Sequence, residues 1–425
     1  MSKISKALEK KSDYLQYGTW LPLKGMRNPK EFLRQLVCPV DRRLKAHSSA
    51  LRHKMTSLST ALPSNQQKNT TFAKKVTVDK TKEGQSVDLV ELSLDCGSKA
   101  AFLTYGARIV SLCGADGHNV TLSLDTLAAY ESDKSYQGAS IGRVCNRIKD
   151  GQLTIGKKTY QLSQNEGTTC THGGLNGFDK HVWKIESLGE ETHKAYVLMS
   201  TFSPNGDQGF PGDVKATVKY ELEWVADIAC TVLNITYGVE SQADFPTVVN
   251  LTNHVYWNLS GKQNQGENIW SHTLRLGTKE YLETDAKLLP TGRILQAEPQ
   301  SYLDFTEERL LKGPPKEETG IRNGYDHFFV FDKTGTKTIM NWMSTVRHAE
   351  SKRTLQLYSD QPGVQFYTGT FLQASTMFPF HQYQGFCLEP SGFIDAVHHS
   401  NFPSILLNPK ETKTQKIQFQ LFCNS

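Results

Sequence analysis

Two histidines and a glutamate supply the residue types that acid–base chemistry needs. His254 lies inside an extended, mostly apolar run at residues 250–259, and His172 directly precedes a pair of glycines. Glu389 also lies in an apolar stretch, where burial would raise the pKa of its carboxyl group from about 4.3 toward neutrality. Because an imidazole titrates near neutral pH, these side chains can act as a general acid and a general base at physiological pH.

Each of these residues also has a structural explanation. A buried histidine is often hydrogen-bonded in a core without doing chemistry. The glycines after His172 let the backbone turn sharply and a ligand approach closely, but the histidine can simply belong to the turn. A buried glutamate without a function is rare. The presence of all three favours a catalytic site.

Residues 142–148 add hydrogen-bond donors of another kind. Arg143, Asn146 and Arg147 offer guanidinium groups and an amide, which suit the neighbouring hydroxyl groups of a neutral polar ligand. The alternative is that the arginines are solvated at strand ends. A phosphate would instead favour several converging cations or a glycine-rich helix N-terminus, and neither accompanies these motifs.

The elements that must position these groups are β-strands. Apolar and polar residues alternate over residues 214–224, 228–237 and 417–422, which predicts half-buried strands. Residues 151–162 predict a hairpin that turns at Gly156. No long amphipathic helix is evident, so the fold class is all-β. So many strands need covered edges or two large sheets packed face to face.

The chain resembles the aldose 1-epimerase (galactose mutarotase) family from about residue 76 to its end. Its matching segments follow the family order, which makes a chance match far less probable than for one short motif. They are Gly-Ala-Arg-Ile-Val-Ser-Leu at 106–112, Asn-Arg-Ile at 146–148, His-Gly-Gly-Leu-Asn-Gly-Phe-Asp at 172–179, Asn-Leu-Thr-Asn-His at 250–254, Leu-Pro-Thr-Gly at 289–292, Gly-Tyr-Asp-His at 324–327, Pro-Gly-Val-Gln-Phe-Tyr-Thr-Gly at 362–369 and Leu-Glu-Pro at 388–390.

The resemblance implies a large antiparallel β-supersandwich with its site in a cleft on one sheet. It also implies that Glu389 is the catalytic base, that His254 is the acid, and that His172 binds the sugar and assists near the ring oxygen. The substrate-binding positions that match the family are Asn146, Arg147, Asp326 and Gln365. The reaction opens and closes an aldose ring to interconvert its α and β anomers, and it implies no cofactor and no metal.

Two departures from the family pattern concern specificity. Ser391 and Gly392 follow Pro390 where many relatives carry a polar amide, and Trp257 replaces a frequent phenylalanine. We expect both near the site, where they would alter sugar preference more than the reaction. Trp257, Phe386 and Tyr367 are candidate apolar walls, although aromatic residues more often pack in a core.

Residues 1–75 differ from the rest in charge. They contain sixteen Lys or Arg and four acidic residues, which gives them a net charge of +12. Because the whole chain has a net charge of +5, the remaining residues have a net charge of −7. We expect a mostly flexible basic extension and linker, with one short helix at residues 29–37, followed by a catalytic domain at residues 76–425. Binding to nucleic acid or an anionic membrane, an organellar transit peptide and translation from Met55 remain alternatives for this extension.

Several features predict a cytoplasmic protein. No apolar run is long enough to cross a membrane, and the N-terminus lacks the apolar core of a secretory signal. The eight cysteines include no C-x-x-C pair and are expected to be reduced thiols. Of five N-x-S/T sequons, two begin at Asn250 and Asn258, where glycans would disrupt the strand of His254.

These observations predict a cofactor-independent isomerase of free hexoses such as galactose and glucose, present as a monomer or weak homodimer. We expect no nucleic-acid partner. A sugar-binding protein that has the cleft without turnover is one alternative, because fold and motif do not prove activity. A hexose-phosphate epimerase is the second.

Overall fold

The computed structural model describes residues 70–262, 266–312, 324–336, 339–375 and 378–423. The chain divides into two compact units, Met1–Lys54 and Met55–Ser425, and all described residues belong to the second. The predicted helix at residues 29–37 lies outside the described residues. Within the described ranges, no helix has the length and apolar character that crossing a membrane requires.

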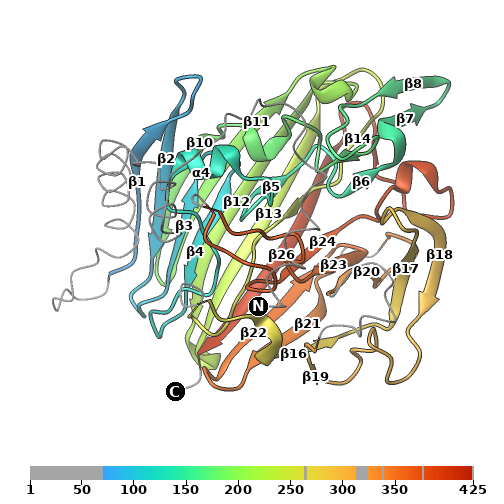
Figure 1. The fold of residues 1–425 in the computed structure, drawn as a ribbon. Coiled ribbons are helices and arrows are strands. Elements are labelled where there is room, and N and C mark those ends of the chain that lie inside the picture. The colour runs from blue at the N-terminus through green and yellow to red at the C-terminus, as the bar shows by residue number, and fades with distance from the viewer. Residues whose placement is uncertain (1–69, 263–265, 313–323, 337–338, 376–377, 424–425) are drawn as a thin grey trace, which may run out of the picture. The chain divides into compact units, whose positions relative to one another are not determined.

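Nine antiparallel strands form the largest sheet, in the order β10, β11, β12, β13, β26, β22, β21, β16 and β19 (Figure 1). Their bounds, in the same order, are Lys184–Glu191, Lys194–Ser203, Val214–Val225, Cys230–Ser241, Thr412–Cys423, Arg353–Ser359, Asn341–His348, His272–Leu276 and Arg309–Leu310. The three segments predicted from alternation become β12, β13 and β26, which are neighbours at the centre of this sheet. In β12, every second residue from Val214 to Leu222 is buried, as the period of two requires.

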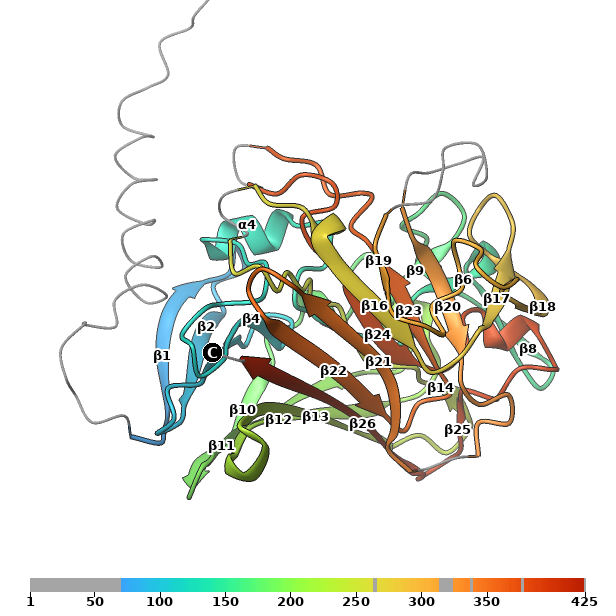
Figure 2. The ribbon, with the colours of Figure 1, turned by 90° about the horizontal axis from the view of Figure 1, so that it is seen from below.

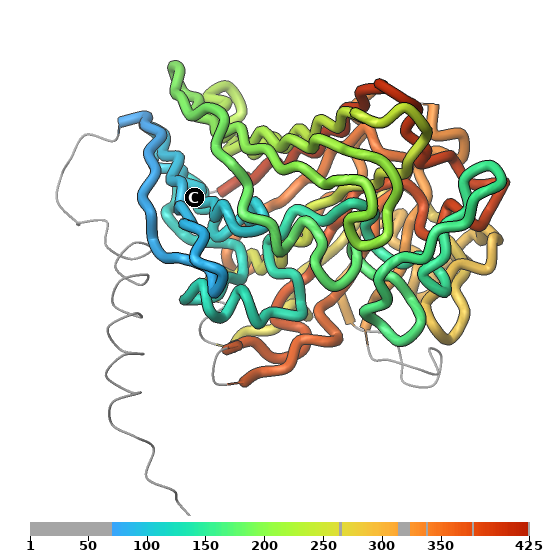
Figure 3. Tube along the Cα trace, turned by 90° about the horizontal axis from the view of Figure 1, so that it is seen from above, coloured from blue at the N-terminus to red at the C-terminus, as the bar shows by residue number. Residues whose placement is uncertain are grey.

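Two smaller antiparallel sheets complete the main layers. The five-stranded sheet has the order β18 (Pro290–Gln296), β17 (Glu280–Thr284), β20 (Asp326–Val330), β23 (Gly363–Tyr367) and β24 (Cys387–Ser391). The four-stranded sheet consists of β1 (Phe72–Lys80), β2 (Ser86–Ser93), β3 (Lys99–Leu103) and β4 (Arg108–Cys113). Figures 1 and 3 show the four-stranded sheet at one end of this unit and the β17–β18 hairpin at the other.

Short paired segments connect the layers. They are β6 (Arg147–Ile148) with β9 (Cys170–Thr171), β5 (Ser140–Ile141) with β15 (Thr252–Asn253), β14 (Thr247–Val248) with β25 (Leu406–Leu407), and β7 (Gln152–Ile155) with β8 (Lys158–Gln161). The β7–β8 hairpin confirms the predicted turn, where Gly156 adopts a positive φ of 61°. The described helices are short: α4 (Leu127–Ser132) and 3-10 turns at Lys149–Gly151, Phe178–Lys180, Asp207–Gly209, Ala226–Ile228, Ile269–Ser271 and Ala396–His398.

The main core lies between the nine-stranded sheet and the two smaller sheets, and the edge-on view shows the layers (Figure 2). On the five-stranded sheet, Val364, Phe366 and Leu388 enter this core. Residues alternate between the two faces of a strand, so Gln365 and Glu389 point to the opposite face. The core therefore fixes the sheet whose other face carries the candidate site. This arrangement confirms the predicted all-β sandwich.

The run that carries His254 is less regular than predicted. Only Thr252 and Asn253 pair as a strand, with β5, although all ten residues from 250 to 259 are buried. Side chains still alternate between two faces along this run, because Leu251, Val255, Trp257 and Leu259 all belong to the main core. His254 therefore points away from that core.

Candidate active site

Three neighbouring strands of the five-stranded sheet place polar side chains on one face. Gln365 on β23 lies directly opposite Glu389 on β24, and Asp326 on β20 lies opposite Tyr367 on β23. Residues that face each other across a ladder, or follow at intervals of two, share one face of the sheet. The amide nitrogen of Gln365 donates a hydrogen bond of 2.6 Å to Oδ1 of Asp326. The sequence-predicted residues of these three strands thus meet at one surface.

His254 reaches the same surface from the irregular run after β15. Its backbone N–H donates to the carbonyl of Ala139 and its carbonyl accepts from the N–H of Gly138, both at 2.9 Å. Because these partners belong to a loop, they hold the histidine backbone without extending a strand. The side chain is buried, and its ring packs edge-on against the ring of His172 with centroids 5.3 Å apart.

Two further predicted residues, Asn146 and His172, flank the β6–β9 pair. Asn146 and His172 both adopt a positive φ, of 56° and 52°, which is uncommon for residues with a Cβ. They hold each other: the N–H of His172 donates to the carbonyl of Asn146 at 2.9 Å, and the N–H of Asn146 donates to Nδ1 of His172 at 3.3 Å. Since Nδ1 accepts, the neutral ring of His172 carries its proton on Nε2.

The glycine after His172 serves the backbone rather than a ligand. Gly173 has a φ of 89°, and a Cβ at this position would lie 1.9 Å from the carbonyl oxygen of Gly142. The space left by the absent Cβ of Gly173 was predicted to admit a ligand, but the backbone of Gly142 occupies it. A glycine is required here because any side chain would separate these two chain segments.

All seven predicted site residues line one cleft, which has a volume of about 1020 Å³. A cleft of this size has room for a sugar ring and ordered water. The seven residues are Asn146, Arg147, His172, His254, Asp326, Gln365 and Glu389.

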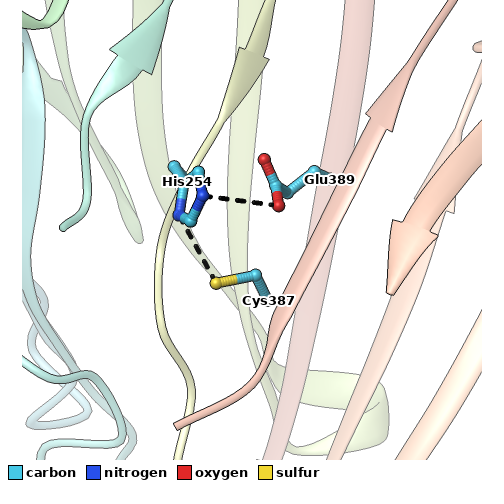
Figure 4. Close-up of side chains that lie close together, drawn as sticks. All are labelled: His254, Cys387 and Glu389. Carbon is cyan, nitrogen blue, oxygen red and sulfur yellow. Dashed lines mark hydrogen bonds and ion pairs between the residues drawn. The ribbon is translucent and has the colours of Figure 1, made fainter. Parts of the chain in front are cut away.

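The centre of the cleft is a close contact between an imidazole and a carboxyl group. Nε2 of His254 lies 3.7 Å from Oε1 of Glu389, and both side chains are at most 6% exposed (Figure 4). On the other side of the ring, Nδ1 of His254 lies 3.5 Å from the Cys387 thiol. Figure 4 shows the imidazole between these two groups, which come from the same strand, β24.

Burial controls the protonation of this pair. It lowers the pKa of His254 to about 4 and raises the pKa of Glu389 well above its ordinary value, and the Asp326 carboxylate raises the latter further. Both shifts favour the uncharged forms of the two groups. The sequence predicted the rise for Glu389 but placed His254 near neutrality, because the depth of its burial was unknown.

Arg147 is held by a residue that the sequence did not single out. Its Nε and Nη2 donate to the two carboxylate oxygens of Glu166 at 2.9 and 3.2 Å. Burial alone would lower the pKa of Arg147, but Asp326 and Glu166 outweigh it and raise that pKa. Glu166 also lines the cleft. The two partners are 19 positions apart in the sequence, a separation that leaves no local pattern to reveal the pair.

Arg143 does not belong to the cleft, contrary to the predicted fork of guanidinium donors. It is 1% exposed and donates to the backbone carbonyls of Ser203, Pro211 and Gly212 at 2.8–2.9 Å. It is therefore a structural residue that satisfies carbonyl groups in a loop. The alternative of a solvated arginine is also wrong here.

The two departures from the family pattern lie outside the residues that line the cleft. Trp257 is fully buried in the main core, where its ring contacts Phe419 with centroids 4.6 Å apart. Ser391 is 3% exposed, and its hydroxyl donates to the carbonyl of Gly392. Of the three aromatic candidates, Phe386 also packs in the core, and Tyr367 lines the cleft.

Further tyrosines shape the cleft. Tyr136 and Tyr256 line it with Tyr367, and their rings lie 6.0 and 5.1 Å from the ring of His254. Tyr256 shares the strand face of His254, which was a usable signal in the sequence. Tyr136 comes from a loop with no recognisable motif, so sequence reasoning missed it.

Two groups of described residues have metal-ligand atoms within 4.8 Å of one another. In the first, His254, Cys387 and Glu389, burial raises the pKa of the thiol well above its ordinary value, whereas a metal binds the thiolate. In the second, Glu267, His348 and Glu350, both ring nitrogens of His348 already contact serine hydroxyls. The seven described cysteines are free.

Comparisons with known proteins agree with this geometry. The family model described as aldose 1-epimerase matches residues 88–420. Galactose mutarotase from Bos taurus is 36% identical over 73% of this chain and 86% of its own length. Aldose 1-epimerase from Escherichia coli is 31% identical over 80% of this chain and 96% of its own length.

Solved structures show the same fold. An aldose epimerase homologue from C. elegans has a TM-score of 0.68 at 25% identity, over 79% of this chain and 98% of its own. A galactose 1-epimerase from Lactobacillus acidophilus has a TM-score of 0.70 at 23% identity, over 84% of this chain and 100% of its own. The chain belongs to the aldose 1-epimerase family and is an isomerase.

Proposed function

We propose that the protein interconverts the α and β anomers of free aldohexoses such as galactose and glucose, with Glu389 as the base and His254 as the acid. The observation that carries this proposal is the buried contact of 3.7 Å between His254 and Glu389 inside the cleft. Mutarotation requires one group that removes the proton of the C1 hydroxyl and one that protonates the ring oxygen. A carboxyl group and an imidazole at this separation can reach both atoms of one sugar.

The sugar brings the pair into its working protonation state. A sugar hydroxyl donates to the Glu389 carboxylate, and the ring oxygen accepts from the His254 imidazolium, so a bound sugar favours the charged form of both groups. The titration of two groups in such close contact belongs to both together. Burial opposes the charged forms until the sugar supplies these partners.

The reaction is then a pair of opposite proton transfers. Glu389 takes the proton of the C1 hydroxyl while His254 gives its proton to the ring oxygen, and the bond between C1 and the ring oxygen breaks. The product is an open-chain aldehyde, which rotates about the bond between C1 and C2. Reversal of both transfers closes the ring on the other face of C1, returns the proton to His254 and leaves Glu389 as the carboxylate.

The remaining residues fit the binding of a neutral sugar. Nε2–H of His172 is available to donate near the ring oxygen, because its Nδ1 is the acceptor for Asn146. The side-chain oxygen of Gln365 is buried with no hydrogen-bond partner among the described residues, so it awaits a donor. We propose that sugar hydroxyls bind to Gln365, Asn146, Arg147 and Asp326.

The charge of the cleft disfavours a sugar phosphate. Six carboxyl groups line it against three cationic side chains. The carboxyl groups belong to Glu131, Asp133, Glu166, Asp179, Asp326 and Glu389, and the cations to Lys134, Arg147 and Lys180. A sugar-binding protein without turnover is disfavoured by the acid–base pair itself, since binding alone does not need two buried titratable groups in contact.

We also propose that residues 76–425 form the catalytic domain and residues 1–75 an extension to it. A cytoplasmic location, also a proposal, is supported by the seven free thiols among the described cysteines, since disulfides form in oxidising compartments.

Exchange NMR at anomeric equilibrium separates the candidate functions. We expect the protein to accelerate exchange between the α and β signals of free galactose, and to leave the exchange of galactose 6-phosphate near its spontaneous rate. Acceleration of the phosphate alone would establish the phosphate enzyme. Line broadening that reports binding, without faster exchange of either sugar, would establish a binding protein.

A further inference from the structure

Part of the Arg147 guanidinium group is already hydrogen-bonded to protein side chains. Its Nε and Nη2 are paired with the two oxygens of Glu166, and Nη1 lies 3.4 Å from the side-chain oxygen of Asn146. A two-point contact between a guanidinium and a carboxylate fixes the plane of both groups. Glu166 therefore determines which edge of Arg147 is presented to a sugar.

Glu166 is itself held in place. Its Oε2 accepts a second hydrogen bond, of 2.8 Å, from the hydroxyl of Thr171. Thr171 lies directly opposite Arg147 in the β6–β9 ladder. The backbone of Glu166 is tied to Thr169 by hydrogen bonds in both directions, at 3.2 and 3.0 Å. Three constraints thus hold a carboxylate whose side chain is still 49% exposed at the edge of the cleft.

The same contact compensates a charge. Arg147 is the cation among the predicted sugar-binding residues, and its side chain is only 11% exposed. An unpaired guanidinium at this depth would attract an anionic ligand. Glu166 and Asp326 both line the cleft, and the charges of these two carboxylates act on the guanidinium.

We propose that Glu166 is a positioning and specificity-determining residue of the site. It orients Arg147 for the hydroxyl groups of a neutral aldose, and it cancels the charge that would otherwise admit aldoses bearing a carboxylate or phosphate. This inference rests on the proposed function, because it concerns the sugar bound by the same cleft. It assigns to Glu166 a role that acts through Arg147 and not through direct contact with the reacting atoms.

Two substitutions separate the two parts of this role. Glu166→Gln keeps the length of the side chain and removes its charge, whereas Glu166→Asp keeps the charge and withdraws it from the two-point contact. The matched control is Glu283→Gln. Glu283 makes the same kind of two-point pair with Arg293 and also accepts from a threonine hydroxyl, that of Thr291, but it does not line the cleft.

The test measures the binding of galactose and galacturonate by calorimetry, together with the mutarotation kinetics of galactose. In Glu166→Gln we expect galacturonate affinity to rise about fivefold at low salt and less than twofold at high salt, because screening weakens an exposed charge. In Glu166→Asp we expect KM for galactose to rise about two- to fivefold with kcat within about twofold, and galacturonate to stay excluded. The control should match wild type in every assay.

Unchanged galacturonate affinity in Glu166→Gln at low salt would overturn the proposal, as would an equal gain in Glu283→Gln. Calorimetry keeps this result separate from the proposed function. Wild-type protein that binds galactose without accelerating mutarotation would refute the function, and the binding data would still decide whether Glu166 excludes anionic sugars.

Discussion

Gln365 lies directly opposite Glu389 in the ladder between β23 and β24. Its amide donates to Asp326 on the next strand, so three adjacent strands carry one polar row. Asp326 raises the pKa of Glu389, whose burial is the larger cause of the shift. The β-ladder therefore sets both the position of the proposed base and part of its proton affinity.

Replacement of His254 should abolish most of the catalysis. Asparagine can replace the Nδ1 side of the ring, next to Cys387, but it has no atom at the position of Nε2, next to Glu389. In His254→Asn we expect kcat to fall by about 10²- to 10⁴-fold, the usual contribution of a general acid, with KM within a few-fold of wild type. Steady-state polarimetry measures both. A raised KM with unchanged kcat would assign His254 to binding instead.

Arg143 should affect stability rather than sugar binding. Arg143→Lys leaves carbonyl groups of Ser203, Pro211 and Gly212 without donors, because an ammonium cannot reproduce the guanidinium fork. We expect the free energy of unfolding to fall by about 2–3 kcal/mol, measured by urea denaturation. The KM for galactose should not change, and a selective rise in KM would show that Arg143 contributes to the cleft after all.

His254 should make the fold sensitive to acid. Its pKa is about 4 in the folded protein and 6.5 as an ordinary value, so between these values the unfolded chain binds a proton that the folded chain excludes. The free energy of unfolding therefore falls as the pH falls from 6.5 to 4.

Asparagine at position 254 does not titrate and removes this contribution. Between pH 7 and pH 4.5, His254→Asn should lose about 2 kcal/mol less stability than wild type. Urea denaturation at the two pH values measures the difference, with His381→Asn as the control because His381 is exposed. Equal losses in wild type and His254→Asn would show that the ring is not buried in its neutral form.

Sequence periodicity predicted the strands whose ladders are long. β12, β13 and β26 each have twelve residues, and the alternation of apolar side chains over such a length indicates a strand. The run around His254 has the same alternation but pairs over two residues only. Its other backbone groups bond to loops, and those partners leave no trace in the run itself.

Motifs identified the candidate site residues, but they did not reveal the partners of these residues. Family-like segments located all seven predicted residues, and the structure brings them to one cleft. Glu166 pairs with Arg147 through side chains and lies outside the β6–β9 ladder, which has two residue pairs and is too short to give a sequence pattern. Trp257 was a candidate apolar wall of the site, but it lies three residues after His254, and a shift of three residues along an extended chain turns the side chain to the opposite face.

The central claim is that Glu389 is the base of a mutarotase, and polarimetry of freshly dissolved α-D-galactose tests it most directly. Glu389→Gln keeps the shape of a buried side chain that cannot accept the C1 proton. We predict that wild-type protein accelerates the approach to anomeric equilibrium, that Glu389→Gln loses at least about 10²-fold in kcat, and that calorimetry still detects galactose binding to the variant. A variant that binds galactose and retains the wild-type rate would contradict the account.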